Sequence, residues 1–89
     1  MSATEASTMT LTVLFFAQAR DRAGCARRTL ELPDGSRVAD AVAALRADHP
    51  ALEPLWPHLA IAMNGALVPE QASLVAGSEL ALLPPVSGG

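Results

Sequence analysis

The segment at residues 11–16 constrains the fold more than any other part of this chain. It is rich in residues that favour β-strands, and side chains in a strand alternate between two faces. These faces are Leu11, Val13 and Phe15 on one side, and Thr12, Leu14 and Phe16 on the other. Both faces become apolar toward the end of the segment. Such a strand either lies at the centre of a sheet covered on both sides, or exposes one face to a partner.

One helix is predicted to cover this sheet. Apolar residues recur at helical spacing and form one stripe, which consists of Val38, Ala41, Val42 and Leu45. A turn at residues 33–35 precedes the helix, since Pro, Asp and Gly each favour a turn there. Either Ser36 or Arg37 is the N-cap. His49 followed by Pro50 ends the helix.

Four more strands are expected, at residues 28–32, 59–63, 67–68 and 79–83. The Asn64-Gly65 pair between two of them is a strong signal for a two-residue hairpin turn. We expect a polar loop or short helical turn at residues 18–27 and an irregular connecting loop at 52–58. The predicted order is β-β-α-β-β-β, with one helix on one face of the sheet.

Composition limits the functions open to the chain. Its 89 residues make one small domain, and with 51% hydrophobic residues it is expected to be globular. The net charge of −3, with no basic patch larger than Arg27-Arg28, argues against nucleic acid. No apolar run approaches the roughly 18 residues of a membrane span. A single cysteine, Cys25, cannot form an internal disulfide, so the cytoplasm is the expected location.

Conventional catalytic groups are poorly represented. His49 and His58 have no cysteine or paired carboxylate at ligand spacing, so no metal site is expected. Cys25 has Arg27 and Arg28 nearby but no histidine base beside it in sequence. The internal glycines are isolated in turns, which excludes a glycine-rich phosphate loop. The reactive group that remains is the C-terminal carboxylate.

The final six residues favour a role for that carboxylate. They are Pro84, Pro85, Val86, Ser87, Gly88 and Gly89. Prolines favour an extended backbone, and glycines without a Cβ can pass through a narrow channel. A Gly-Gly end also arises by chance, in frayed tails and in cloning scars. On the functional interpretation, ATP activates the carboxylate as an acyl-adenylate, and a sulfur nucleophile then gives a thiocarboxylate.

Three segments carry a family resemblance. The sequence VLFFAQAR at residues 13–20 resembles the opening strand and turn of the molybdopterin synthase small subunit (MoaD). MNGALV at residues 63–68 is similar to the hairpin of that family and of its thiamine-pathway relatives (ThiS). LLPPVSGG at residues 82–89 is similar to the C-terminal signature of the molybdopterin branch. The resemblance runs in register from about residue 9 to residue 89.

The resemblance implies an α+β fold, the ubiquitin-like β-grasp. In this fold the first and last strands pair in parallel at the centre of a mixed sheet, with one main helix on one face. The expected organisation is a disordered extension at residues 1–8, a β-grasp domain at 9–83 and an extended tail at 84–89.

The resemblance also implies a function. An adenylating E1-like enzyme would use ATP to activate Gly89, and a sulfur donor protein would supply the sulfur of a thiocarboxylate. The chain would then dock to the large synthase subunit, whose active site converts cyclic pyranopterin monophosphate into the molybdopterin dithiolene. The chain itself would be a non-catalytic, sulfur-donating subunit without a bound cofactor. Two sulfurs per dithiolene imply a heterotetramer of two small and two large subunits.

The expected site has two parts. Gly88 and Gly89 carry the chemistry, and Pro84, Pro85, Val86 and Ser87 contact the partner along the tail. Phe16, Leu67 and Leu83 are predicted to form an exposed apolar patch beside the root of the tail, at positions that match the family's hydrophobic interface. The alternative is that these three residues complete the core. Arg20 either steers the tail or an anionic partner surface, or is a solvated loop residue.

Three other functions stay open. The chain could be a sulfur carrier for thiamine, cysteine or tRNA thiolation, or a ubiquitin-like modifier whose Gly89 is conjugated to lysines of targets. It could also be a binding module with an incidental tail. All six basic residues are arginine, so the chain cannot form lysine-linked chains with itself.

Overall fold

The strand predicted at residues 11–16 lies inside a sheet. In the computed structural model, which describes residues 7–84, this strand is β1 (Thr8–Phe15). It pairs antiparallel with β2 (Arg27–Pro33) and parallel with β5 (Glu79–Leu83). β1 therefore has a hydrogen-bonded neighbour along each of its edges.

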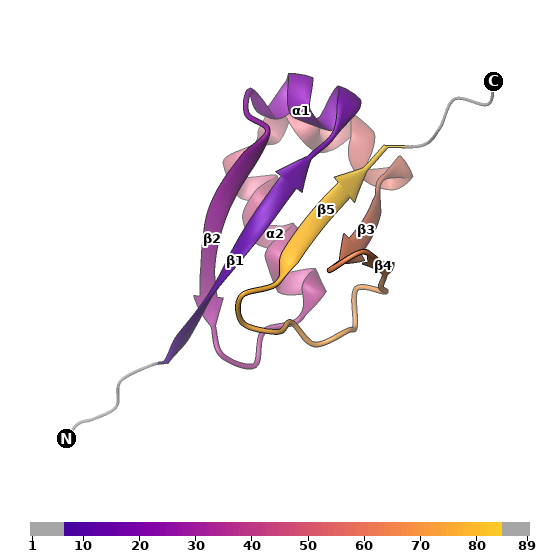
Figure 1. The fold of residues 1–89 in the computed structure, drawn as a ribbon. Helices are drawn as coiled ribbons and strands as arrows, with labels where there is room; N and C mark the ends of the chain where they lie inside the picture. The colour runs from indigo at the N-terminus through magenta and orange to yellow at the C-terminus, as the bar shows by residue number, and fades with distance from the viewer. Residues whose placement is uncertain (1–6, 85–89) are drawn as a thin grey trace.

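Within residues 7–84 the sheet has five strands in the order β2-β1-β5-β3-β4 (Figure 1). β3 (Ala60–Met63) and β4 (Ala66–Leu67) form the predicted hairpin. Its turn residues Asn64 and Gly65 have φ angles of 51° and 88°, and a type I′ turn requires positive φ at both positions. The first and last strands are parallel neighbours inside a mixed sheet, so the predicted β-grasp architecture is confirmed.

The amino-terminal boundary differs from the one expected. Residues 1–6 lie outside the described part of the chain, whereas Thr8 is the first residue of β1 and pairs with Pro33. The Ser7 carbonyl accepts a hydrogen bond of 3.0 Å from the Asp34 backbone N–H. Backbone pairing, which any residue can make, extends the strand beyond its apolar pattern.

In the described part of the chain three helices accompany the sheet: α1 (Ala17–Ala23), α2 (Val38–Asp48) and the 3₁₀ helix η1 (Pro50–His58). α2 is the predicted helix, and Arg37 rather than Ser36 is its N-cap. The Asp40 carboxylate accepts the Arg37 backbone N–H at 2.8 Å and so satisfies a free donor at the helix start.

The prediction of an irregular loop at residues 52–58 is wrong, because this segment belongs to η1. A 3₁₀ helix has three residues per turn, so Leu52 and Leu55 lie on one face, and both are buried. Pro54 and Pro57 suggested a loop because they break α-helices. α1 likewise forms a short helix in the region expected to be a polar loop or helical turn.

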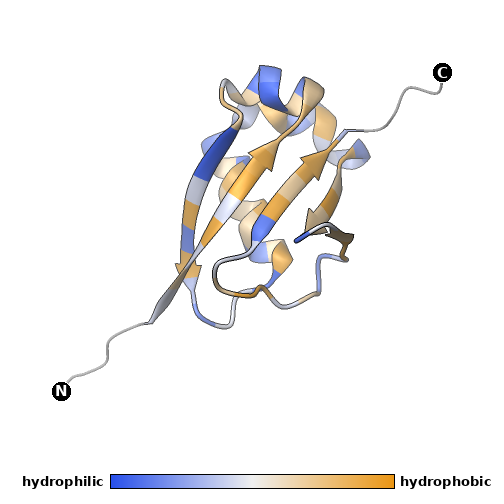
Figure 2. Ribbon diagram, in the orientation of Figure 1, coloured by the Kyte–Doolittle hydropathy of each residue, from blue (hydrophilic) through white to orange (hydrophobic). Residues whose placement is uncertain are grey.

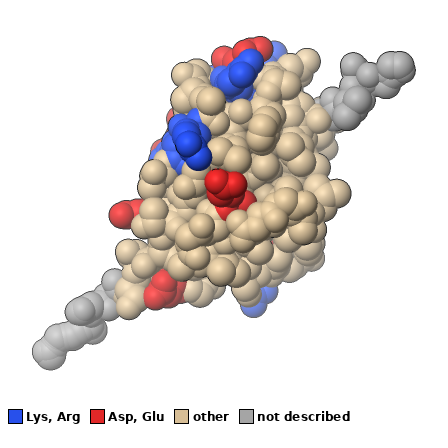
Figure 3. All heavy atoms as spheres, in the orientation of Figure 1, with Lys and Arg blue, Asp and Glu red and all other residues tan. Residues whose placement is uncertain are grey.

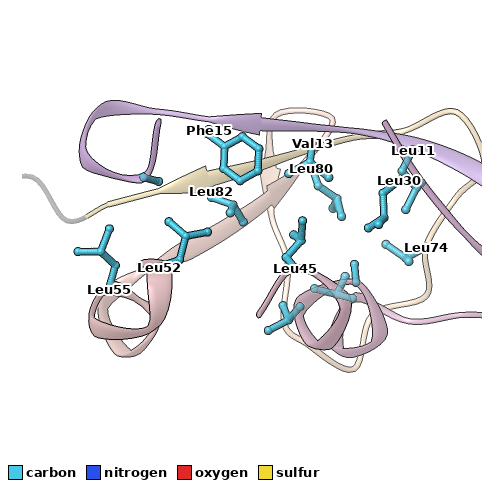
Figure 4. Packing of buried hydrophobic residues seen from close by; sticks show 14 of the residues in the cluster. Leu11, Val13, Phe15, Leu30, Leu45, Leu52, Leu55, Leu74, Leu80 and Leu82 are labelled. Carbon is cyan, nitrogen blue, oxygen red and sulfur yellow. The ribbon is translucent and has the colours of Figure 1, made fainter. Parts of the chain in front are cut away.

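The core lies between the sheet and the helices α2 and η1 (Figure 4). Leu11, Val13 and Phe15 of β1 point into it and are at most 2% exposed. Leu80 and Leu82 of β5 lie beside them, each 1% exposed. This alternation confirms which face of each central strand is covered, and it directs the intervening residues to the opposite face.

An ion pair links η1 to α2. The Arg46 guanidinium donates two hydrogen bonds to the Glu53 carboxylate, of 2.9 Å from Nε and 2.8 Å from Nη2. The hydrogen bond and, to a smaller extent, the positive charge of Arg46 lower the pKa of Glu53. Both side chains are about half exposed, so the pair adds little to the stability of the domain.

Ala17 provides a test of the local backbone. Its φ of 49° lies in the left-handed region, which costs an L-residue roughly 1–2 kcal/mol. Ala17→Gly should remove that strain, offset by the greater unfolded-state entropy of glycine, and stabilise the domain by about 0.5 kcal/mol. Thermal unfolding should show a rise in Tm of about 2–4 °C. A lower Tm would mean that Ala17 is not in this conformation in solution.

Candidate functional site

No described helix covers the second face of the sheet, which we call the open face (Figure 1). Pairing between neighbouring strands aligns one residue of each strand in a row across this face. The row consists of Arg27, Leu14, Ala81, Ala62 and Leu67, from β2 to β4. Its interior is apolar, and its one charged member is at the β2 border. Orange, hydrophobic segments of β1, β5 and β3 are visible from this side (Figure 2).

A second apolar group lies toward the carboxyl ends of β1 and β5. Phe15 pairs with Leu82, and the next residues along the two strands are Phe16 and Leu83. Leu83 in turn pairs with Ala60 of β3. Side chains alternate along each strand, so Phe16, Leu83 and Ala60 lie on the open face, as the first row does. Phe15 and Leu82 point into the core.

The predicted patch residues are all on this face. Phe16 is 44% exposed and Leu67 is 71% exposed, while Leu83 is half-buried. None of the three belongs to the buried core cluster. Leu83 is followed by Pro84, the last described residue, so this member of the patch lies at the root of the C-terminal segment, whereas Leu67 lies on the border strand β4. The other predicted tail and reaction residues lie outside the described part of the chain; these are Pro85, Val86, Ser87, Gly88 and Gly89.

The local backbone explains why Phe16 is displayed outward. Phe16 has an extended conformation, with φ −117° and ψ 149°, and is the N-cap of α1. Its carbonyl accepts the backbone N–H groups of Ala19 at 2.9 Å and Arg20 at 3.4 Å. Ala17, the first residue of α1, then has a positive φ. The strand therefore ends at a fixed corner that holds the ring at the edge of the open face.

A groove of about 330 Å³ lies next to this ring. Its lining residues are Leu14, Phe15, Phe16, Arg20, Ala26 and Arg27. The lining is mostly apolar, and Arg20 and Arg27 are its two charged residues. Arg27 lies 4.0 Å from the Glu79 carboxylate, and both side chains are more than half exposed, so this pair is weak. Sequence reasoning placed Leu14 on the same face as Phe16 but missed Arg27, because only the strand register places Arg27 beside Leu14.

His49 and Cys25 both pack against other side chains. The His49 ring packs edge-on against Phe15, with ring centroids 5.4 Å apart, and Arg28 Nη1 lies 3.2 Å from its Nε2. Cys25 is half-buried and packs against the core. Between residues 7 and 84 no group of three His, Cys, Asp or Glu residues could hold a metal ion. The helices in the same range are too short and too polar to cross a membrane.

Comparison with known proteins identifies relatives over nearly the whole chain. The model of the ThiS family matches residues 13–89. The molybdopterin synthase sulfur carrier subunit of Chlamydomonas reinhardtii is 40% identical over 83 residues, which are 91% of this chain and 100% of the relative. Small archaeal modifier protein 1 of Haloferax volcanii is 37% identical over 82 residues, covering 83% of this chain and 94% of the relative.

Solved structures show the same architecture. The crystal structure of that Haloferax protein superimposes with a TM-score of 0.82 at 33% identity, covering 90% of this chain and 99% of the other. A complex of subunits 1 and 2 of the molybdopterin-converting factor from Helicobacter pylori contains a chain with a TM-score of 0.70 and 26% identity. That match covers 91% of this chain and 100% of the other.

Proposed function

The chain belongs to the ThiS family, and from this membership we propose that it is the sulfur carrier and small subunit of a molybdopterin synthase. The observation that carries the proposal is the match over the full length of the Chlamydomonas carrier subunit at 40% identity. The geometry supports it, because β5 ends beside an exposed apolar patch and leads directly into the Gly-Gly segment.

The chemistry proceeds at the Gly89 carboxylate. A carboxylate is a poor acyl donor because its oxygen is a poor leaving group. An adenylating enzyme would join it to AMP from ATP and release pyrophosphate. A persulfide on a donor protein would then displace AMP and form an acyl disulfide. A second thiol would attack its S–S bond, which releases the thiocarboxylate and leaves a disulfide on the donor. The sulfur would pass to cyclic pyranopterin monophosphate in the active site of the large subunit, and two loaded carriers would complete one dithiolene.

The folded domain supplies docking rather than catalysis. Phe16, Leu67 and Leu83 would contact the large subunit, with the segment from Pro84 to Ser87 reaching toward its active site. The Helicobacter relative in a complex of subunits 1 and 2 supports a partner of this kind. A reducing compartment, which we take to be the cytoplasm, would keep the thiocarboxylate and Cys25 from oxidising.

Detection of the thiocarboxylate tests the proposal. The Cys25→Ala chain would be incubated with ATP, an adenylating enzyme and a sulfur source, then treated with a thiol-selective alkylating reagent. Label on the peptide that ends at Gly89 is expected. Mass alone is insufficient, because sulfur for oxygen adds about 16 Da, which is close to the mass added by methionine oxidation. No label under conditions that load a known carrier would reject the proposal.

Phe16→Arg should disrupt docking to the large subunit. Truncating or charging a central interface residue typically costs about 2–4 kcal/mol, so the Kd should rise roughly 30- to 1,000-fold. Titration calorimetry with the large subunit would measure this. Val75→Arg is the matched control, because Val75 is 56% exposed on the loop before β5 and lies outside the patch. Equal affinities of the two variants would show that the patch is not the docking surface.

A second candidate is a ubiquitin-like protein modifier, which the identity to the Haloferax modifier protein favours. Both functions need an activated Gly89, but a modifier would transfer its acyl group to a lysine of a target. Adducts resistant to thiols and hydroxylamine after ATP treatment would favour the modifier. A chain without lysine would be attached to targets as single units rather than as lysine-linked chains.

A further inference from the structure

The groove beside Phe16 combines a mostly apolar lining with two basic residues. Leu14 and Phe16 are among its apolar residues, and Arg20 and Arg27 are the basic ones. No carboxylate is among the described residues that line it. The open face in Figure 3 is mostly uncharged, with blue basic side chains gathered on its α1 and β2 side.

The groove is continuous with the predicted docking patch. Phe16 belongs to both, and Leu14 stands in the same row across the sheet as Leu67. A partner that covers the patch would therefore also remove water from the neighbouring arginines. Burying a guanidinium group without an acceptor is unfavourable, so a stable complex needs acceptors opposite these arginines, and carboxylates are the acceptors that also compensate the charge.

The chain itself supplies little of this compensation. Arg20 forms no ion pair with another described residue, and Arg27 has only the exposed contact with Glu79 at 4.0 Å. The chain as a whole carries a net charge of −3, so the positive charge of the groove is local. The positive charge of the groove therefore favours a local acidic group on the partner's surface, and not a partner with a negative net charge in general.

We propose that Arg20 and Arg27 are specificity-determining residues, which pair with carboxylates of the large subunit around an apolar side chain that fills the groove. This inference rests on the proposed function, because it needs the large subunit as a partner. Arg27 exchanges its weak contact with Glu79 for a better-positioned carboxylate in the complex. Glu79 is thus a competitor for the arginine that the partner must bind.

Charge reversal with a matched control tests the proposal. The affinity of the full chain for the large subunit would be measured at low and high salt for Arg20→Glu, Arg27→Glu and Arg22→Glu. Arg22 is an exposed α1 residue outside the groove, and its substitution by Glu changes the net charge by the same amount as the other two substitutions. We expect Arg20→Glu and Arg27→Glu each to raise the Kd about tenfold or more at low salt. Arg22→Glu should change it less than about threefold, and salt should reduce the differences.

Glu79→Gln provides an effect of opposite sign. Removing the competing carboxylate should lower the Kd about twofold, which corresponds to the usual strength of an exposed ion pair. If the groove variants bind as Arg22→Glu does, or if Glu79→Gln weakens binding, the proposal is wrong while docking through Phe16 stands. If the unmodified chain does not bind the large subunit at all, the proposed function fails and this inference with it.

Discussion

Removal of Gly88 and Gly89 should abolish thiocarboxylate formation. The truncation shortens the C-terminal segment by about 7 Å, since an extended residue spans roughly 3.5 Å. A misplacement of about 1 Å at a reacting centre can reduce a rate about 100-fold, so we expect loading to fall by at least that factor. The measurement is thiol-selective labelling of the C-terminal peptide in the Cys25→Ala background.

The length of the segment, rather than its composition, is the variable under test. Ser87→Ala keeps the length and the Gly-Gly end and should load nearly as well as the unmodified chain. The truncated chain should still bind the large subunit through the open face, with a loss confined to the contacts of the missing residues. Label at the new C-terminus of the truncated chain would show that activation does not require the two glycines.

Phe15→Ala should remove much of the stability of the domain, whereas Phe16→Ala should not. Phe15 is 2% exposed, and replacing a buried Phe by Ala typically costs about 3–5 kcal/mol. A domain of this size has a total stability of roughly 4–13 kcal/mol. Thermal unfolding should therefore show a Tm lower by about 12–40 °C, from about 4–8 °C per kcal/mol. Phe16 is 44% exposed, and its replacement should cost less than about 1 kcal/mol.

Substitution of Phe15 should thus lower the stability of the domain, whereas substitution of the neighbouring Phe16 should lower its affinity for the large subunit. Phe16→Ala should weaken binding to the large subunit in a chain that unfolds almost normally. If instead both substitutions destabilise the domain equally, Phe16 is a core residue and the open-face patch is reduced to Leu67 and Leu83.

The sequence was most informative where the structure depends on residues that are close together in the sequence. Alternation along β1, the apolar stripe of α2 and the Asn64-Gly65 turn are local patterns, and each was found in the structure. The resemblance supplied the long-range arrangement, namely the parallel pairing of β1 with β5. The exposure of Phe16 also followed from alternation, once the covered face of the sheet was assigned, whereas the exposure of Leu67 was expected from the family resemblance.

The features that were missed depend on register or on uncommon geometry. Arg27 lies opposite Leu14 because of strand pairing, which no local pattern specifies. The three-residue spacing of Leu52 and Leu55 was the available signal for η1, but the prolines obscured it. Ala17 gave no sign of its positive φ, because left-handed backbone is normally associated with Gly or Asn.

The parallel pairing of β1 and β5 also has a mechanical consequence. The described chain begins and ends at opposite ends of these two adjacent strands (Figure 1). Tension applied between the two ends would shear this ladder, so its hydrogen bonds would bear the load together instead of opening in sequence. We expect single-molecule stretching in this direction to need more force than peeling the β3–β4 hairpin from the sheet edge; equal forces would contradict this. A partner could then pull on the C-terminal segment without unravelling the domain that carries it.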